Sequence, residues 1–211
     1  STILSSLLLL ENYGRDEYEQ AKATHMSRIK RAVNNMTSIL NDFLSLSKME
    51  EGKVEITYAE MDIRQRIVEI VDEMNTVKKR DQTIRYEHMG PTDEILMDEQ
   101  FLRNILINLV SNAIKFSGDD GTISIGSTIA GGKLRLQVTD NGVGIPEEEQ
   151  KHLFNRFFRA RNVQNINGTG LGLHIVKRYV DMMKGTISLT SVQGETSFAI
   201  EIPLLPEPSL G

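Results

Sequence analysis

Three asparagines and one lysine recur at helical spacing between residues 99 and 116. Asn104, Asn108, Asn112 and Lys115 are separated by four, four and three residues, so they share one face of a helix. Asparagine is a poorer helix former than alanine by roughly half a kcal/mol, so repeating it on one face weakens the helix. Amide oxygens suit Mg²⁺, which usually keeps waters and substrate phosphates in its shell, and the lysine places an ammonium group nearby. The pattern predicts a magnesium and phosphate site, and a solvated helix face is the alternative.

A second cluster directly follows a predicted strand and reads Asp140-Asn141-Gly142-Val143-Gly144-Ile145-Pro146. Its glycines allow a tight turn and a close approach of the backbone to a ligand. An aspartate at the end of a strand can accept a hydrogen bond from an exocyclic amine such as that of adenine. The alternative is a plain Asx-type turn that leads into a helix with proline in its first turn.

A third cluster opens a helix and reads Gly168-Thr169-Gly170-Leu171-Gly172-Leu173-His174. Small residues at the start of a helix expose backbone N–H groups, which suit phosphate oxygens. The cluster is not a P-loop, because the Gly-Lys-Ser/Thr element is missing, and Leu173 stands where the dinucleotide fingerprint needs glycine. A glycine-rich hinge without a ligand is the alternative.

Composition excludes several classes of function. The 211 residues contain 24 basic and 29 acidic side chains, a net charge of −5, which gives no footprint for nonspecific binding to nucleic acid. Cysteine is absent, so disulfides, thiolate metal sites and thiol nucleophiles are excluded. The longest apolar run, Leu7–Leu10, is far shorter than the roughly 20 residues that span a bilayer. These features predict a soluble protein of a reducing compartment, without membrane contact.

The first fifty residues predict a helical hairpin that dimerises. The first predicted helix runs from Thr2 to Tyr13, and the second follows Gly14 and ends near Gly52. Apolar residues of the second helix step by three or four positions, as in a helix–helix seam: Met26, Ile29, Val33, Met36, Leu40 and Phe43. A hairpin has little interior of its own, so the seam is expected to pack against a second copy as a four-helix bundle. Packing on the chain's own globular domain is the alternative.

After Gly52 the pattern changes to mixed helices and strands, which predicts a two-layer α/β sandwich with antiparallel strands. The predicted helices are 62–80, 99–116, one that begins at 146, and 171–183. The predicted strands are 53–58, 83–87, 94–97, 122–129, 133–139, 186–192 and 197–202. Residues 206–211 are predicted to be a tail. The domain assignment is therefore 1–52 for the hairpin and 53–205 for the sandwich.

In their order along the chain, the three clusters resemble the catalytic core of the two-component sensor histidine kinases. The resemblance covers nearly the whole chain, including the end of the hairpin at residues 46–52. It implies an α+β fold in which the hairpin precedes an ATP-binding sandwich of the Bergerat type. The gyrase, heat-shock-90 and mismatch-repair ATPases share this sandwich.

The resemblance assigns a role to individual residues. Asn112, assisted by Asn108, is expected to hold Mg²⁺, and Lys115 to contact the phosphates of ATP. Phe116 is expected to line the adenine face and Asp140 to receive the adenine amine. The backbone is expected to enclose the nucleotide at Gly142 and Gly144 beside the base, and at Gly168, Thr169, Gly170, Leu171, Gly172 and Leu173 around the phosphates.

Two further segments are similar to family elements. Phe154 and Phe157 resemble the Phe-box that anchors a lid, and Arg159 is a candidate for contact with the terminal phosphate, with a solvent-facing arginine as the alternative. Residues 161–167 are expected to form the lid over the nucleotide. The last family element, Gly-x-Gly-Thr, is altered here because Glu195 replaces one glycine, so only Gly194 and Thr196 match it.

The implied activity is that of an ATP-dependent protein-histidine kinase. The γ-phosphoryl group passes to a histidine on the dimerisation helix and then to an aspartate of a response-regulator receiver domain. In the family that histidine precedes residues like Ser1–Leu4, so this chain is expected to lack it and not to phosphorylate itself. His25 is expected at the surface or in bundle packing, His88 and His152 at the surface, and His174 near the phosphates. The implied location is the cytoplasm, with or without a membrane anchor in the parent protein.

Two other functions share these features. A nucleotide-gated dimeric scaffold without phosphotransfer is disfavoured by the intact asparagine, aspartate and glycine sets. An ATP-hydrolysing mechanical clamp on the same sandwich is disfavoured by the hairpin and by Asn108, where such ATPases carry a glutamate base. No paired carboxylates or histidine cluster predicts a hydrolase or a histidine-rich metal centre.

Overall fold

The computed structural model describes residues 2–12, 18–163, 166 and 168–205. Its backbone divides into two compact units, Ser1–Glu50 and Glu51–Gly211. The predicted tail, residues 206–211, lies outside the described residues. Within the described residues, no helix is long and apolar enough to cross a membrane.

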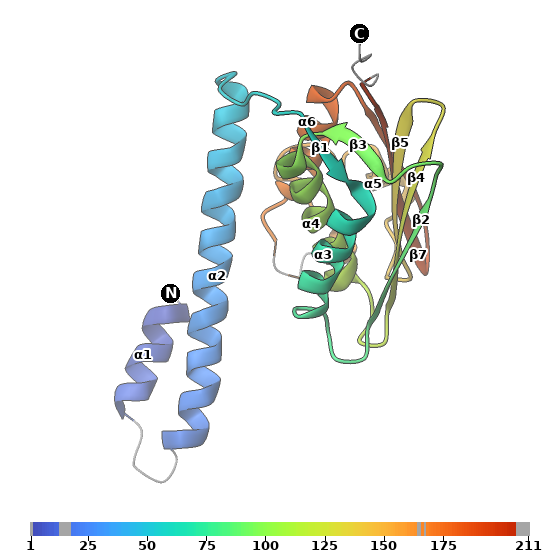
Figure 1. Cartoon of the computed structure of the whole chain (residues 1–211). Coiled ribbons are helices and arrows are strands. Elements are labelled where there is room, and N and C mark those ends of the chain that lie inside the picture. The colour runs from blue at the N-terminus through green and yellow to red at the C-terminus, as the bar shows by residue number, and fades with distance from the viewer. Residues whose placement is uncertain (1, 13–17, 164–165, 167, 206–211) are drawn as a thin grey trace. The chain divides into compact units, whose positions relative to one another are not determined.

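The first unit is a pair of helices, α1 (Thr2–Asn12) and α2 (Tyr18–Glu50), that pack side by side (Figure 1). The predicted turn at Gly14 lies outside the described residues. Within this unit α1 leaves the seam of α2 open: Met36 is 62% exposed and Phe43 is 54% exposed. An open seam is what a second copy would cover, and the dimeric bundle stays a prediction.

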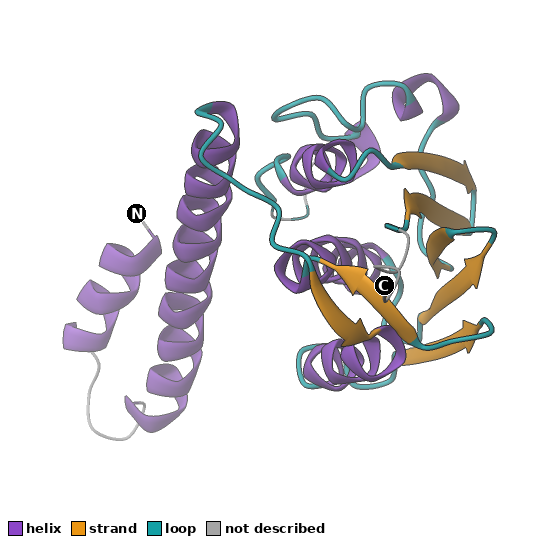
Figure 2. Cartoon of the chain, turned by 45° about the horizontal axis from the view of Figure 1, so that its top comes forward, coloured by secondary structure: helices purple, strands orange, loops and turns teal. Residues whose placement is uncertain are grey.

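The second unit is a five-stranded sheet with helices along one face, so the predicted α+β class is confirmed (Figure 2). The strands lie in the order β2-β4-β5-β7-β6. Their bounds are β2 (Thr83–Met89), β4 (Thr122–Ala130), β5 (Lys133–Asp140), β6 (Thr186–Val192) and β7 (Glu195–Pro203). Three helices cover the sheet: α3 (Ile63–Asn75) packs on β2, α4 (Glu99–Phe116) on β4 and β5, and α6 (Gly172–Met182) on β6.

The sheet is mixed, and the prediction of antiparallel strands throughout is wrong at one pair. β2 and β4 run parallel, with Thr83 opposite Thr122. The chain between these strands passes through β3 (Glu94–Met97) and α4, and a parallel pair needs such a crossover. The other three pairs in this sheet are antiparallel.

The predicted strand at residues 53–58 is wrong, and β1 (Ala59–Asp62) forms directly after it. β1 pairs antiparallel with β3, so that Ala59 lies opposite Met97. Beyond Met97 the chain turns into α4, so residues 53–58 have no partner strand. The Thr57 N–H donates instead to the Asp98 carboxylate, at 2.7 Å.

Two aspartates fix where the helices begin. The Asp62 side chain accepts the N–H of Gln65 at the start of α3, at 2.8 Å, and Asp98 accepts the N–H of Phe101 at the start of α4, at 2.9 Å. Such N-caps contribute about 1 kcal/mol each. The predicted end of the first of these helices at residue 80 is wrong, because α3 stops at Asn75. Gln82 holds the next turn by accepting the Lys79 N–H at 3.0 Å.

The core lies between the sheet and α4. This helix buries a broad apolar face against the strands and its neighbours: Phe101, Leu102, Ile105, Leu106, Leu109, Val110, Ala113 and Ile114. Facing side chains from the strands include Ile123, Leu134, Leu136 and Ile200, all under 2% exposed. Truncating such a leucine to alanine typically costs 2–5 kcal/mol. The core therefore holds α4, and its polar stripe, at a fixed angle.

Candidate functional site

The polar stripe of α4 faces α6 and the segment that precedes it. Asn104 is used for packing, because its amide donates to the Tyr179 hydroxyl on α6 at 2.8 Å. The Asn108 amide donates to the Asn104 carbonyl at 2.8 Å. Asn112 and Lys115 follow on the same face and are half-buried. The predicted stripe thus divides: Asn104 joins two helices, Asn108 and Lys115 border the third cluster, and Asn112 lies between these two on the same face.

Two glycines of the third cluster lie so close to this stripe that a side chain at either position would displace a stripe side chain. A Cβ on Gly172 would fall 2.6 Å from Asn108 Oδ1, and a Cβ on Gly168 would fall 2.6 Å from Lys115 Nζ. Both distances are far below a normal van der Waals contact. The fold therefore brings together the first and third clusters, which are about sixty residues apart in the sequence.

The start of α6 presents backbone N–H groups. Leu171 is the N-cap residue and supplies no side-chain hydrogen bond to the first turn. The Thr169 hydroxyl accepts the Leu171 N–H at 3.1 Å, which folds the loop before the helix. The N–H groups of the first turn, which includes Gly172 and Leu173, receive no side-chain cap, as an anion site requires.

Lys115 supplies a positive charge beside Gly168. Burial lowers the pKa of its ammonium group, and the positive charge of Arg159 lowers it further. The Lys115 Nζ also lies 5.0 Å from the centre of the Phe116 ring, within cation–π range. A bound anion would relieve the repulsion between the two cations, so this position favours phosphate.

The second cluster follows β5 and lies beside the C-terminal end of α4, where Gly142 approaches the Phe116 carbonyl. Asp140 ends β5 and is 6% exposed. Burial raises the pKa of its carboxyl to about 6, and the hydrogen bond from the Gly142 N–H, at 2.9 Å, opposes that rise. A carboxyl with so little solvation is a strong acceptor for an amine that reaches it.

Both glycines of this cluster lie where the loop backbone comes very close to a neighbouring element, so a side chain would collide with it. A Cβ on Gly142 would fall 2.7 Å from the Phe116 carbonyl, at the end of α4. Gly144 has a φ of +71°, and a Cβ there would collide with the Val192 carbonyl of β6. The loop after β5 therefore packs closely against both α4 and β6. This packing places the second cluster next to the helix that carries the first.

Thr196 belongs to the same end of the site. It is 5% exposed and pairs with Asp140 across β5 and β7. Its hydroxyl lies 2.9 Å from the Ser191 hydroxyl, which also accepts the Ile145 N–H at 3.0 Å. Gly194 lies in the turn between β6 and β7, and a Cβ there would meet no atom within 4 Å.

Comparison with known families decides what this arrangement is. Residues 97–206 match the model of the histidine kinase-, DNA gyrase B- and HSP90-like ATPases. The chain belongs to this family. α4, the loop after β5 and the start of α6 carry the three clusters and lie within the matched residues, so this part of the chain is an ATP-binding catalytic domain of the histidine kinase type.

Curated proteins that align with most of this chain are named histidine kinases. The chain is 32% identical over 212 residues to the circadian input-output histidine kinase CikA of Synechococcus elongatus, and 36% identical over 188 residues to the sensor histidine kinase RcsC of Escherichia coli. These alignments cover 95% and 85% of this chain, but 27% and 20% of the relatives. An uncharacterized sensor-like histidine kinase of Rhizobium meliloti is 29% identical over 94% of this chain and 38% of its own length.

Solved structures agree with the fold. Full-length ShkA in complex with AMPPNP matches 99% of this chain and 43% of its own, with a TM-score of 0.76 and 26% identity. Histidine kinase ThkA in complex with the response regulator protein TrrA matches 97% of this chain and 57% of its own, with a TM-score of 0.73 and 25% identity.

In this ATPase domain, Arg159 and the Phe-box lie beside the glycine-rich segment. The Arg159 guanidinium donates to the carbonyls of Val163, at 3.0 Å, and Ile166. Phe157 is 64% exposed and has a φ of +62°, which is rare for a side chain other than glycine. Its N–H donates to the Gly170 carbonyl at 3.0 Å. Arg159 therefore organises the predicted lid in this structure, and its contact with phosphate stays a prediction.

The predictions for the four histidines have different outcomes, and His152 is exposed as expected. The prediction that His88 lies at the surface is wrong, because its side chain is 4% exposed and its Nδ1 lies 2.6 Å from the Ser127 hydroxyl. His25 is 4% exposed within the hairpin unit. His174 uses its Nδ1 for a 2.9 Å contact with the Phe154 carbonyl.

Sequence reasoning missed three residues that hold the site together. The Gln150 amide donates to the Ile145 carbonyl and the Asn162 amide donates to the Gly144 carbonyl, both at 2.9 Å. Glu149 is buried and accepts the Arg161 N–H at 2.9 Å. A buried glutamate in a short helix of the ATPase domain, α5 (Glu147–Gln150), has no periodic signal, so nothing in the sequence marked it.

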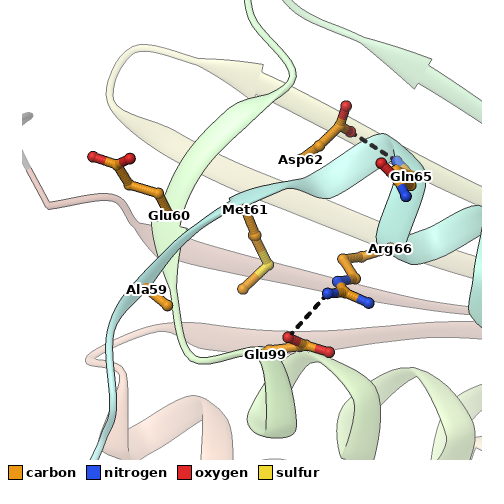
Figure 3. Close-up of a pocket in the computed structure, with 7 residues that line it drawn as sticks. All are labelled: Ala59, Glu60, Met61, Asp62, Gln65, Arg66 and Glu99. Carbon is orange, nitrogen blue, oxygen red and sulfur yellow. Dashed lines mark hydrogen bonds and ion pairs between the residues drawn. The ribbon is translucent and has the colours of Figure 1, made fainter.

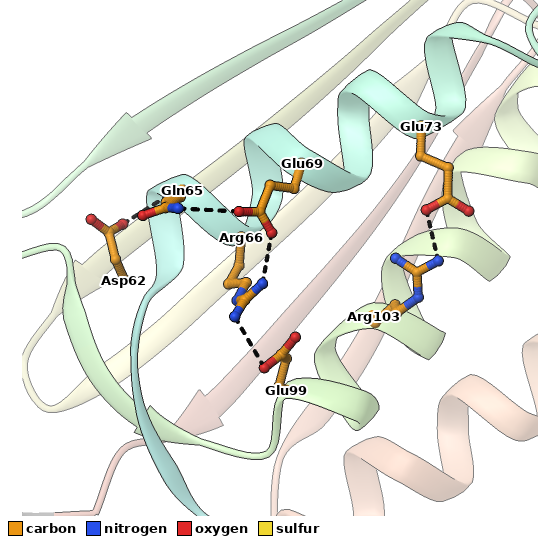
Figure 4. Close-up of polar contacts among 7 residues, drawn as sticks. All are labelled: Asp62, Gln65, Arg66, Glu69, Glu73, Glu99 and Arg103. Atoms are coloured by element: carbon orange, nitrogen blue, oxygen red, sulfur yellow. Dashed lines mark hydrogen bonds and ion pairs between the residues drawn. The ribbon is translucent and has the colours of Figure 1, made fainter.

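The domain also has a hollow of about 240 Å³ away from these clusters (Figure 3). It is lined by Ala59, Glu60, Met61, Asp62, Gln65, Arg66 and Glu99. Ion pairs beside it tie α3 to α4: Arg66 lies 3.4 Å from Glu99, and Arg103 lies 2.7 Å from Glu73 (Figure 4). Glu99 starts α4 and Asn112 is near its end, roughly 20 Å along the axis at about 1.5 Å per residue. The hollow is therefore separate from the nucleotide site.

Proposed function

We propose that this chain is the catalytic part of a two-component sensor kinase that binds MgATP and phosphorylates a histidine. An imidazole nitrogen of that histidine attacks the γ-phosphorus, the bond to the bridging oxygen of ADP breaks, and the imidazole proton is lost to solvent. The products are phosphohistidine and ADP. The phosphoryl group then passes to an aspartate of a response-regulator receiver domain.

One observation carries this proposal: the close approach of Gly168 and Gly172 to Lys115 and Asn108. It brings together an amide oxygen, an ammonium group and backbone N–H groups that have no side-chain cap, all of which suit a polyphosphate. The buried Asp140 at the other end suits the amine of adenine. The groups around Lys115 and the carboxyl of Asp140 are together complementary to an adenine nucleotide.

The residues present also fit Mg²⁺. Asn112 and Asn108 would supply neutral oxygen ligands, so the charge of the ion would remain available to the phosphates. When bound, Mg²⁺ supplies charge neutralisation to the transferring phosphoryl group. Lys115 would hold the phosphates in place, and Arg159 is proposed to reach the terminal phosphate. Positioning of this kind provides most of the rate enhancement in phosphoryl transfer.

The proposed partners are a second copy of the chain and a response regulator. The open apolar seam of α2 supports dimerisation through the hairpin, and the ThkA complex with TrrA supports a receiver-domain partner. We propose that none of the chain's own histidines is the acceptor, because His25 and the side chain of His88 are buried and His174 is engaged with Phe154. The exposed His152 lies in the turn after α5 of the ATPase domain and not on a helix of the hairpin. Use of ATP places the proposed reaction in the cytoplasm.

Two measurements test the proposal. Calorimetry with MgATP and MgADP should give saturable binding that is lost in Asp140→Ala and weakened in Asn112→Ala. Incubation with γ-labelled ATP and a separate protein carrying an acceptor histidine on a dimerisation helix should label that protein. Binding without transfer would favour a nucleotide-gated scaffold, whereas steady phosphate release without a labelled histidine would favour an ATPase clamp. Acid-labile label on this chain alone would overturn the assignment of its histidines.

A further inference from the structure

Two side-chain amides hold two consecutive carbonyl groups of the loop after β5. Gln150 donates to the Ile145 carbonyl and Asn162 donates to the Gly144 carbonyl, each at 2.9 Å. This loop contains Asp140 and Gly142, which we propose lie beside the purine. Whatever fixes its carbonyls therefore fixes the wall that recognises the base.

The two amides tie the loop to different parts of the domain. Gln150 ends α5 and also donates to the Ser191 carbonyl at 2.9 Å, so it joins the loop to β6. Asn162 lies in the 3₁₀ turn η1 (Arg161–Val163), on the segment that leads to the glycines at 168–172. Asn162 thus connects the purine side to the phosphate side.

The turn that carries Asn162 is itself held on both sides. Glu149, whose side chain is 7% exposed, accepts the Arg161 N–H at 2.9 Å and lies 3.0 Å from Arg161 Nε. The Arg159 guanidinium donates to the Val163 carbonyl at 3.0 Å. Because its neighbours are fixed, Asn162 offers its amide to Gly144 with little loss of freedom on making the bond.

The backbone at Gly144 has little room to move. Its positive φ and its contact with the Val192 carbonyl allow only a narrow range of backbone positions. Two residues earlier, the Gly142 N–H donates to Asp140 at 2.9 Å. A shift of Gly144 therefore passes through the loop to the carboxyl proposed to accept the adenine amine.

We propose that Asn162 is a positioning residue for adenine recognition, which acts through the Gly144 carbonyl without touching the nucleotide. Glu149 serves it by fixing the turn. The inference rests on the proposed function of the site, because it assigns a role in binding the adenine nucleotide. It extends that function to a residue of the lid segment that no cluster in the sequence singles out.

The test uses MgADP and MgIDP, whose purine carries a carbonyl where adenine carries the amine. Asn162→Ala and the isosteric Asn162→Asp, which lacks the donor, are expected to weaken MgADP binding about five- to tenfold, the value of one hydrogen bond. MgIDP affinity should change less than twofold, because Asp140 has no amine to accept. Amide hydrogen exchange should accelerate at residues 140–146 in both variants. Asn155→Ala, an exposed asparagine of the neighbouring segment, is the matched control and should alter neither quantity.

Three results would overturn the inference. Equal weakening of MgADP and MgIDP would place the role of Asn162 on the phosphate side. Unchanged MgADP affinity in both variants, with the wild type binding and Asp140→Ala failing to bind, would remove the positioning role and leave the proposed function standing. Absence of MgADP binding to the wild-type chain would refute the proposed function and the inference together.

Discussion

The Asn108 amide oxygen lies 2.6 Å from the place where a Cβ on Gly172 would stand. One residue belongs to the polar stripe of α4 and the other is the first residue of α6. Because Gly172 has no side chain, the Asn108 amide can occupy this position, and a larger residue would displace the amide. The relationship links a fold constraint to the proposed phosphate site.

Gly172→Ala tests that link. Alanine is the better helix former, so the helix itself should not weaken. The new methyl group should push the Asn108 side chain aside, and MgADP affinity should fall about tenfold or more. Calorimetry measures the affinity and thermal unfolding measures stability, which should change little. Unchanged affinity would show that Asn108 does not contribute to nucleotide binding.

Gly144→Ala should destabilise the domain more than Gly194→Ala. Both positions have positive φ, +71° and +88°, which costs a non-glycine residue about 1–2 kcal/mol. Only Gly144 also meets a backbone carbonyl, that of Val192, which cannot swing away. Chemical denaturation of the two variants should give a loss of about 1 kcal/mol at Gly194 and at least twice that at Gly144. Equal losses would mean that the loop can move away from β6.

The Asp140 carboxyl should make both stability and binding depend on pH. Burial raises its pKa from the ordinary 3.8 to about 6, so between about pH 4 and 6 the folded chain holds a proton that the unfolded chain has lost. The free energy of unfolding should therefore fall as pH rises through this window, by roughly 2 kcal/mol after allowance for solvent screening. Affinity for MgADP should change in the opposite sense and rise towards pH 7, because the ionised carboxylate is the better acceptor.

Asp140→Asn is the control for this pH dependence. Denaturation curves at several pH values should lose the slope between pH 4 and 6 that the wild type shows. A variant that keeps the wild-type slope would assign it to another group.

Asn112→Ala and Asn104→Ala should separate metal binding from helix packing. Asn112 is proposed to ligate Mg²⁺, so its loss should abolish the dependence of ADP affinity on Mg²⁺ concentration. Asn104 donates to Tyr179, so its loss should lower stability by about 1 kcal/mol and leave the Mg²⁺ dependence intact. ADP titrations at several Mg²⁺ concentrations give the answer. The same Mg²⁺ response in Asn112→Ala as in the wild type would exclude Asn112 as a ligand.

The seam of α2 should determine the oligomeric state. Met36 and Leu40 are 62% and 56% exposed, so a charge at either position should not disturb the single chain but should oppose burial against a second copy. Met36→Glu with Leu40→Glu is expected to convert dimer to monomer in sedimentation experiments. Asn41→Glu, beside the seam, should leave the dimer intact. A wild-type chain that sediments as a monomer would contradict the bundle.

Regular elements with strong periodicity were predictable, and elements set by distant contacts were not. The bounds of α4, β3 and β6 match the sequence prediction, because their apolar patterns are long or sharply bounded. The end of α3 was missed because the Gln82 side chain organises the following turn. The strand predicted at residues 53–58 does not form, because β3 is too short to pair with it. The apolar pattern of the sequence contains no information on either contact.

The sequence by itself determined which residue types can meet a nucleotide: the amides and lysine on one helix face, the aspartate at the end of a strand, and the glycines before a helix. These follow from local spacing, which sets faces and turns without reference to the rest of the chain. Only the tertiary structure decided that Asn104 packs on Tyr179 while Asn108 faces Gly172, and that Asn162 holds Gly144. Such pairings depend on how the core sets α4 and α6 against the sheet, and no single segment encodes that.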